Sequence, residues 1–184
     1  MSIEGEHFHL HSLVASTMCE RFRRILCHAT KIDGVFIINF TEKSLTAKGF
    51  RAVMDWMYTR SPPISMIDVI QKTGWKQQDG PFMALSYDIM RAADYFGLDE
   101  MLKAYSGYFT TMITNANAIE NLKLYSAIPG LHAMRDFIVE YVVANSSALR
   151  ECESWAQIKE MPPEVLCLLV DGFGRHQGDT ACPA

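Results

Sequence analysis

The sequence predicts an α+β protein that is predominantly helical, with a few short strands among its first helices and helices alone in its second half. Two observations predict the strands. Residues 6–11 alternate between polar and apolar side chains, and residues 35–40 are a β-branched and aromatic run after the turn pair Asp33-Gly34. A third observation predicts the helices, because from Phe82 onward apolar residues recur at the spacing of one helix face.

The composition excludes several classes of protein. The chain has 184 residues, 49% hydrophobic and 21% charged, as in globular proteins and unlike disordered ones. Its net charge is −4 and its basic residues form no stripe, which argues against a nucleic-acid-binding protein. We expect no signal peptide, because Met1 leads into a polar segment, and no apolar run approaches the roughly 20 residues that span a bilayer. We therefore expect a cytoplasmic or nuclear protein with five free cysteines that contacts neither membrane nor nucleic acid.

The first half is expected to contain three helices and a long loop. Ser12 is expected to cap a helix that Ser16-Thr17 divides into two. Thr46 is expected to cap the next helix, whose apolar stripe from Phe50 to Tyr58 ends before Ser61-Pro62-Pro63. Residues 64–81 are expected to form a surface loop, with one helical turn at residues 66–71.

The second half is expected to be helical throughout. Gly97 should end a helix that begins at Phe82, and Asn117 should begin another in a capping-box pattern with Glu120. Pro129 is expected in the first turn of a helix, and Ser146 or Ser147 is expected to cap a short one. Pro162-Pro163 should start a last helix that continues through Val170. The Gly-rich end over residues 172–184 is expected to be frayed.

Residues that carry catalytic chemistry form no strong pattern. The sequence lacks the nucleophile-elbow, P-loop, dinucleotide-binding and zinc-protease motifs. His7, His9 and His11 would share one face of a strand, but about 6.5 Å apart at each step, too extended for a tetrahedral metal site. Cys27 and His28 would point about 100° apart on a helix. We expect no enzyme, no cofactor and no metal; a small metal- or thiol-dependent enzyme using these residues is the catalytic alternative.

Three blocks of sequence, in this order, resemble the BTB/POZ family. Residues 11–26, HSLVASTMCERFRRIL, resemble the family pattern in which a His opens a helix, a small residue breaks it and Phe-Arg begins the next. Residues 50–59, FRAVMDWMYT, look like the family's Phe…Leu…Tyr-Thr helix, and residues 92–98, AADYFGL, are similar to its A-A-D-Y-L-x-[IL] signature. Residues 117–170 look like the start of a BACK region.

The resemblance implies a fold in three parts. A BTB/POZ-like helix cluster flanked by a small short-stranded sheet is expected over residues 1–116, and a partial, all-helical BACK-like region over residues 117–172. Residues 173–184 are expected to be a flexible tail. Only seven residues precede Phe8, so the family's first strand, which contributes to dimer pairing, is expected to be missing.

The resemblance also implies a function. It implies a non-catalytic protein–protein interaction module, a substrate adaptor or regulator of a cullin-3 ubiquitin ligase that self-associates and binds an unknown substrate protein. Cullin-3 binders of the family carry an apolar-x-Glu motif in the segment that here is residues 27–34, where Ile32 takes the apolar position and Gly34 that of the Glu. The missing Glu favours the alternative, a BTB scaffold or transcription-related oligomerisation protein that recruits no ligase.

Partner contacts are expected where the family binds, on residues 27–34 and on the helix end over residues 92–102. The candidate partner-binding residues are His28, Lys31, Ile32, Tyr58, Asp94, Tyr95 and Phe96.

Overall fold

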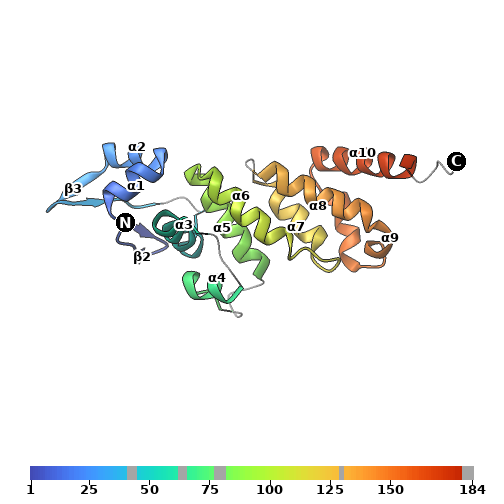
Figure 1. The fold of residues 1–184 in the computed structure, drawn as a ribbon, viewed down its shortest axis with the longest axis horizontal. Helices are drawn as coiled ribbons and strands as arrows, with labels where there is room; N and C mark the ends of the chain where they lie inside the picture. The colour runs from blue at the N-terminus through green and yellow to red at the C-terminus, as the bar shows by residue number, and fades with distance from the viewer. Residues whose placement is uncertain (41–44, 62–65, 77–81, 129–130, 180–184) are drawn as a thin grey trace. The chain divides into compact units, whose positions relative to one another are not determined.

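The computed structural model describes residues 1–40, 45–61, 66–76, 82–128 and 131–179 (Figure 1). Its secondary structure is predominantly helical with two small antiparallel strand pairs, which confirms the predicted α+β class. The chain divides into two compact units, Met1–Tyr108 and Phe109–Ala184, so the division falls at residue 108 where the sequence suggested residue 116. No helix in the described ranges is long and apolar enough to cross a membrane.

The N-terminal strands are shorter than expected. β1 (Ser2–Ile3) pairs antiparallel with β2 (Glu6–His7), so the strand predicted over residues 6–11 keeps only two residues. β1 is equally short, so it offers β2 no further pairing. Phe8, directly after β2, turns into the core, where it is 8% exposed. β1 also bridges Asn39, at Ser2, in parallel.

Two helices follow, as predicted, but their caps differ. α1 (Ser12–Met18) and α2 (Glu20–His28) are separated by Cys19, whose backbone is extended. The break thus falls after Ser16-Thr17. Ser12 is the first helical residue and caps nothing; His11 is the N-cap residue, and its backbone N–H donates to the Tyr58 hydroxyl at 3.0 Å. Cys19 caps α2 with its sulfur, which accepts the N–H of Phe22.

A tight hairpin joins β3 (Thr30–Ile32) to β4 (Val35–Ile37). Asp33 and Gly34 both have positive φ, 49° and 82°, which is the type I′ turn that suits the twist of two-residue hairpins. The turn signal is confirmed. The strand predicted over residues 35–40 is shorter, because β3 supplies only three partners for it.

α3 (Ala47–Thr59) begins as predicted, since the Thr46 hydroxyl accepts the N–H of Gly49 at 3.1 Å. α4 (Met66–Thr73) is a two-turn helix where one turn was expected. It packs on α3 with Val69 and Thr73 buried, and Lys72 forms an ion pair with Asp55 of α3 at 3.1 Å. This packing stabilises a helix that its own short sequence does not predict. Pro62 and Pro63, which were expected to end α3, and residues 64, 65 and 77–81 of the expected loop lie outside the described residues.

α5 (Phe82–Phe96) ends at Gly97, as predicted. Gly97 has φ 65°, and the hydrogen bonds from Gly97 N–H to Asp94 O and from Leu98 N–H to Ala93 O form the Schellman arrangement that favours glycine. The next helix, α6 (Asp99–Thr110), buries its predicted stripe.

The core of the N-terminal unit is a cluster of phenylalanine rings. Phe22 of α2 and Phe96 of α5 are stacked, with ring centroids 4.5 Å apart and ring planes 3° apart. Phe50 of α3 contacts both rings, and Phe8 contacts Phe50 edge-on at 5.0 Å. The residue after β2 and one residue from each of α2, α3 and α5 therefore meet in one apolar centre.

Asp88 of α5 makes stability depend on pH. Burial raises the pKa of this carboxyl above its ordinary value; Glu4 raises it further, while the Thr46 hydrogen bond, Lys48 and Arg91 oppose the shift. The folded state thus binds a proton more tightly than the unfolded state. The contribution of Asp88 to stability is greatest below the ordinary Asp pKa of about 4 and is lost as pH rises through the raised pKa.

Asp88→Asn is expected to be more stable than the wild type at pH 7, with the difference shrinking towards pH 4, because the amide carries no charge to desolvate. Urea unfolding at a series of pH values measures this. Parallel stability curves for the two proteins would contradict it.

The C-terminal unit contains α7 (Ala118–Ser126), α8 (His132–Ala144), α9 (Ser146–Leu149), the 3₁₀ segment η3 (Glu153–Glu160) and α10 (Pro163–Asp179). α8 packs against both α7 and α10. Ile119, Leu122, Ile138, Val142 and Leu169 are among the buried side chains. The helical second half is therefore confirmed. Pro129, expected in the first turn of a helix, lies outside the described residues.

Three local predictions in this unit differ from the structure in part. Asn117 is the N-cap residue of α7, as predicted, but its side chain makes no capping hydrogen bond, because it accepts the N–H of Thr114 at 2.9 Å and donates to the preceding turn. Asn145, and neither Ser146 nor Ser147, is the N-cap residue of α9. α10 continues through the residues expected to be frayed as far as Asp179. Gly172 does not end α10: a Cβ there would lie 2.7 Å from Val143, so the glycine permits close packing on α8.

Candidate protein-interaction surface

The β3–β4 hairpin leaves one of its faces uncovered. The cross-strand pairs Thr30–Ile37 and Ile32–Val35 place these four side chains on one face, since neighbouring residues of a strand point to opposite sides. Ile32, Val35 and Ile37 are 51%, 62% and 46% exposed. We call Thr30, Ile32, Val35 and Ile37 the hairpin face. Figure 1 shows the hairpin projecting from the helices of its unit.

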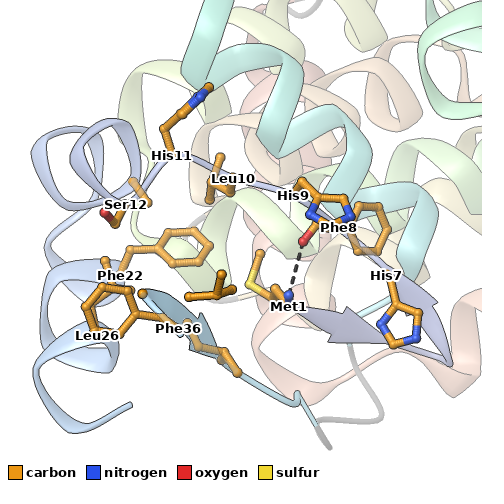
Figure 2. Close-up of a pocket in the computed structure, with 14 residues that line it drawn as sticks. Met1, His7, Phe8, His9, Leu10, His11, Ser12, Phe22, Leu26 and Phe36 are labelled. Carbon is orange, nitrogen blue, oxygen red and sulfur yellow. Dashed lines mark hydrogen bonds between the residues drawn. The ribbon is translucent and has the colours of Figure 1, made fainter. Parts of the chain in front are cut away.

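A first hollow lies between the hairpin, α1 and the N-terminal strands. Its volume is about 690 Å³ (Figure 2). Phe22, Leu26 and Phe36 supply apolar lining from α2 and β4. Met1 lies opposite them and is held in place because its ammonium group donates to the Phe8 carbonyl at 3.0 Å.

The three histidines line this hollow but do not converge. Figure 2 shows the rings of His7, His9 and His11 spread along the chain and pointing in different directions. All three are exposed, and His11 is turned to Tyr58, whose hydroxyl lies 2.9 Å from its Nδ1. Over the described ranges, no group of three or more His, Cys, Asp or Glu side chains has the arrangement of a metal site.

A second hollow, of about 500 Å³, lies between α2 and the hairpin. Half-buried apolar residues, Ile25 and Ala29 of the α2 end and Ile38 after β4, lie beside Ile37 of the hairpin face. The polar lining residues are Arg24, His28, Thr30 and Asn39. The hollow is therefore continuous with the hairpin face through Thr30 and Ile37.

The cysteines of the N-terminal unit differ in their surroundings. Cys27 is exposed at the end of α2. Cys19 is buried, its thiol donates to the Phe96 carbonyl at 3.0 Å, and burial raises its pKa above the ordinary value, so it is a poor nucleophile. Cys152 and Cys167 are also free thiols, and Cys182 lies outside the described residues.

Four of the predicted partner-binding residues are exposed. His28 ends α2, and Lys31 and Ile32 lie on β3, where the Lys31 ammonium is 5.3 Å from the centre of the Phe36 ring. Tyr58 of α3 is 47% exposed, but its hydroxyl contacts His11. His28, Lys31 and Ile32 therefore lie at or next to the hairpin, with Lys31 and Ile32 on its opposite faces, while Tyr58 lies on a different element.

The other three lie at the end of α5, and one of them is wrongly assigned. Asp94 and Tyr95 are half-buried. Arg21 covers Tyr95, with its guanidinium 3.7 Å from the ring centre and a hydrogen bond to the Tyr95 carbonyl. Phe96 is only 1% exposed because it stacks on Phe22 in the core, so as placed it contacts no partner.

Val35, Ile37 and Arg24 were not predicted as partner residues. Residues 35–38 are Val-Phe-Ile-Ile, so no polar alternation marks which side of β4 faces water. A turn pair followed by this run predicts a hairpin but does not indicate which of its sides is uncovered.

The hairpin carries three exposed aliphatic side chains on one face and lies between two hollows. No protein-family model matches the chain, and a comparison with curated proteins found no match. The hairpin face and its neighbouring hollows form the candidate interaction surface of the N-terminal unit.

Proposed function

We propose that the chain is a non-catalytic protein-interaction module of the BTB/POZ type with a BACK-like helical region, which recruits cullin-3 as an adaptor or regulator of a ubiquitin ligase in the cytoplasm or nucleus. The observation that carries this proposal is the hairpin face, with three aliphatic side chains 46–62% exposed on strands of three residues each. A two-stranded hairpin is marginally stable in water by itself, so a covering partner stabilises it. Contiguous exposed aliphatic surface is typical of interaction sites.

The position of this face in the sequence supports cullin-3 as the partner. Ile32 occupies the apolar position of the family's apolar-x-Glu pattern and lies exposed next to the turn. His28 and Lys31, from the same segment, are also exposed. Lys31 points to the face of the hairpin opposite Ile32, because neighbouring residues of a strand alternate, so a partner that covers Ile32 meets Lys31 only by reaching around the edge of β3.

Ile32→Asp is expected to weaken binding of the cullin-3 N-terminal region at least about tenfold, the equivalent of about 1.4 kcal/mol, because a charge would be buried against the partner. Isothermal titration calorimetry with the full chain measures the affinity. Ile67→Asp is the matched control, since Ile67 is 65% exposed on α4, away from the hairpin. No binding by the wild type, or equal loss in both variants, would reject the cullin-3 role.

One observation favours the second candidate, a BTB scaffold or transcription-related protein that oligomerises without a ligase. Gly34, at the Glu position of the pattern, has φ 82° in the type I′ turn. A glutamate there would be strained, because side chains other than glycine rarely adopt this conformation. The scaffold candidate predicts a dimer or larger species by light scattering, together with no heat in the cullin-3 titration.

A further inference from the structure

The segment that supplies most of the residues lining the second hollow carries net positive charge. Residues 20–37 contain four Arg or Lys and two Asp or Glu, a formal charge of +2, in a chain whose net charge is −4. The rest of the chain therefore carries −6, so this segment opposes the sign of the whole molecule. Three of the four cations, Arg21, Arg23 and Arg24, are on α2.

The local partners of these cations leave most of the charge uncompensated. Glu20 is shared by Arg23 and Arg24, with the Arg24 contact at 3.2 Å, so one carboxylate faces two guanidiniums. Arg21 is held by neutral groups, the carbonyl and ring of Tyr95. The Arg24 side chain is 77% exposed at the edge of the hollow.

The hollow combines this charge with an aliphatic floor. Arg24 and His28 are four residues apart on α2 and therefore lie on one side of the helix, as do Ile25 and Ala29 on the neighbouring row. Ile37 and Ile38 complete the apolar part from the hairpin side. A ligand that fills the hollow meets a guanidinium and an imidazole on one edge and branched aliphatic carbon below.

We infer that the second hollow binds an acidic peptide segment of another protein, with a carboxylate directed at Arg24 and an aliphatic side chain on the floor formed by Ile25, Ile37 and Ile38. Charge complementarity identifies the acidic side chain, because charge-assisted hydrogen bonds to a guanidinium are the strongest that the site offers. The aliphatic floor favours a peptide over a nucleic acid. Single-stranded nucleic acids bind through base stacking on aromatic rings, and no Phe, Tyr or Trp is among the residues that line the hollow.

The test uses the full chain and no cullin-3, so its outcome is independent of the cullin-3 titration. The probe is a fluorescein-labelled heptapeptide in which glutamate alternates with isoleucine, measured by fluorescence anisotropy. Arg24→Glu is expected to weaken its binding at least about tenfold. Arg23→Glu is the matched control: the same residue type on the same helix with the same Glu20 partner, but outside the hollow, and it is expected to weaken binding less than about threefold.

Two further measurements distinguish specific binding in the second hollow from nonspecific electrostatic attraction. Ile37→Ser should also weaken binding of the acidic peptide, because the substitution removes part of the aliphatic floor. Circular dichroism of each variant checks that the variant is folded. A heptapeptide with lysine in place of glutamate should not compete. The inference is overturned by the absence of wild-type binding, by equal losses in Arg23→Glu and Arg24→Glu, or by an oligouridine that binds more tightly than the peptide.

Discussion

Phe96→Ala is expected to destabilise the N-terminal unit by about 3–5 kcal/mol, the usual cost of emptying a buried phenylalanine site. The ring is 1% exposed, stacks on Phe22 and contacts Phe50, so its removal leaves a cavity bordered by helices α2 and α3. Single domains are stable by only about 5–15 kcal/mol, so the loss is a large fraction of the total. Urea unfolding followed by circular dichroism and tryptophan fluorescence measures it.

The control for this substitution is Phe137→Ala. Phe137 is the same residue type on α8 of the C-terminal unit and is 40% exposed. Its truncation should cost well under half as much, because less apolar surface is removed from a buried site. Equal losses for the two variants, or a Phe96→Ala protein that unfolds like the wild type, would show that the ring cluster is not the centre of the N-terminal core.

Gly49→Ala is expected to cost about 2 kcal/mol even though alanine is the better helix former. A Cβ at this position would lie 2.9 Å from the carbonyl carbon of Asp88 and closer still to its oxygen. These are backbone atoms of α5, which do not rotate aside, so α3 and α5 must separate. Overpacking of this kind costs about 1–3 kcal/mol, and relief of the helical glycine returns at most about 1 kcal/mol.

Gly107→Ala is expected to change the free energy of unfolding in the opposite direction. Gly107 is also helical, but no atom lies within 4 Å of the position where its Cβ would stand. This variant should gain about 0.5–1 kcal/mol, because alanine loses less conformational entropy on folding than glycine does. Urea midpoints of the two variants, compared with the wild type, provide the measurement. A stabilised Gly49→Ala would show that the α3–α5 packing yields to a methyl group.

The parts of the fold that were predictable depend on residues close together in sequence. The Thr46 cap, the Gly97 end of α5 and the Asp33-Gly34 turn are each set within a few residues, and all three were correct. Asn117 was correct as the start of α7, but its predicted capping bond is absent because the preceding turn competes for its side chain. The length of α4 was underestimated because Lys72 reaches Asp55 on another helix, a contact that no local pattern contains.

The candidate site was predictable in position but not in detail. His28, Lys31 and Ile32 were named from the segment that holds the hairpin, and the structure places them at its surface. Phe96 was misassigned because a motif position carries no information about burial, and its ring points into the core. Which hydrophobic side chains of β4 face water is not encoded in the sequence of the strand alone, because all of its residues are apolar.

Under the proposed function, recognition and folding depend on different residues of this chain. Each strand has three residues, and the side chains of the hairpin face contribute little to the phenylalanine cluster that holds the N-terminal unit together. Substitutions at Ile32, Val35 or Ile37 can therefore accumulate during evolution without unfolding the molecule. Related chains with the same core are free to diverge at these positions, and a change of binding specificity requires only a few mutations.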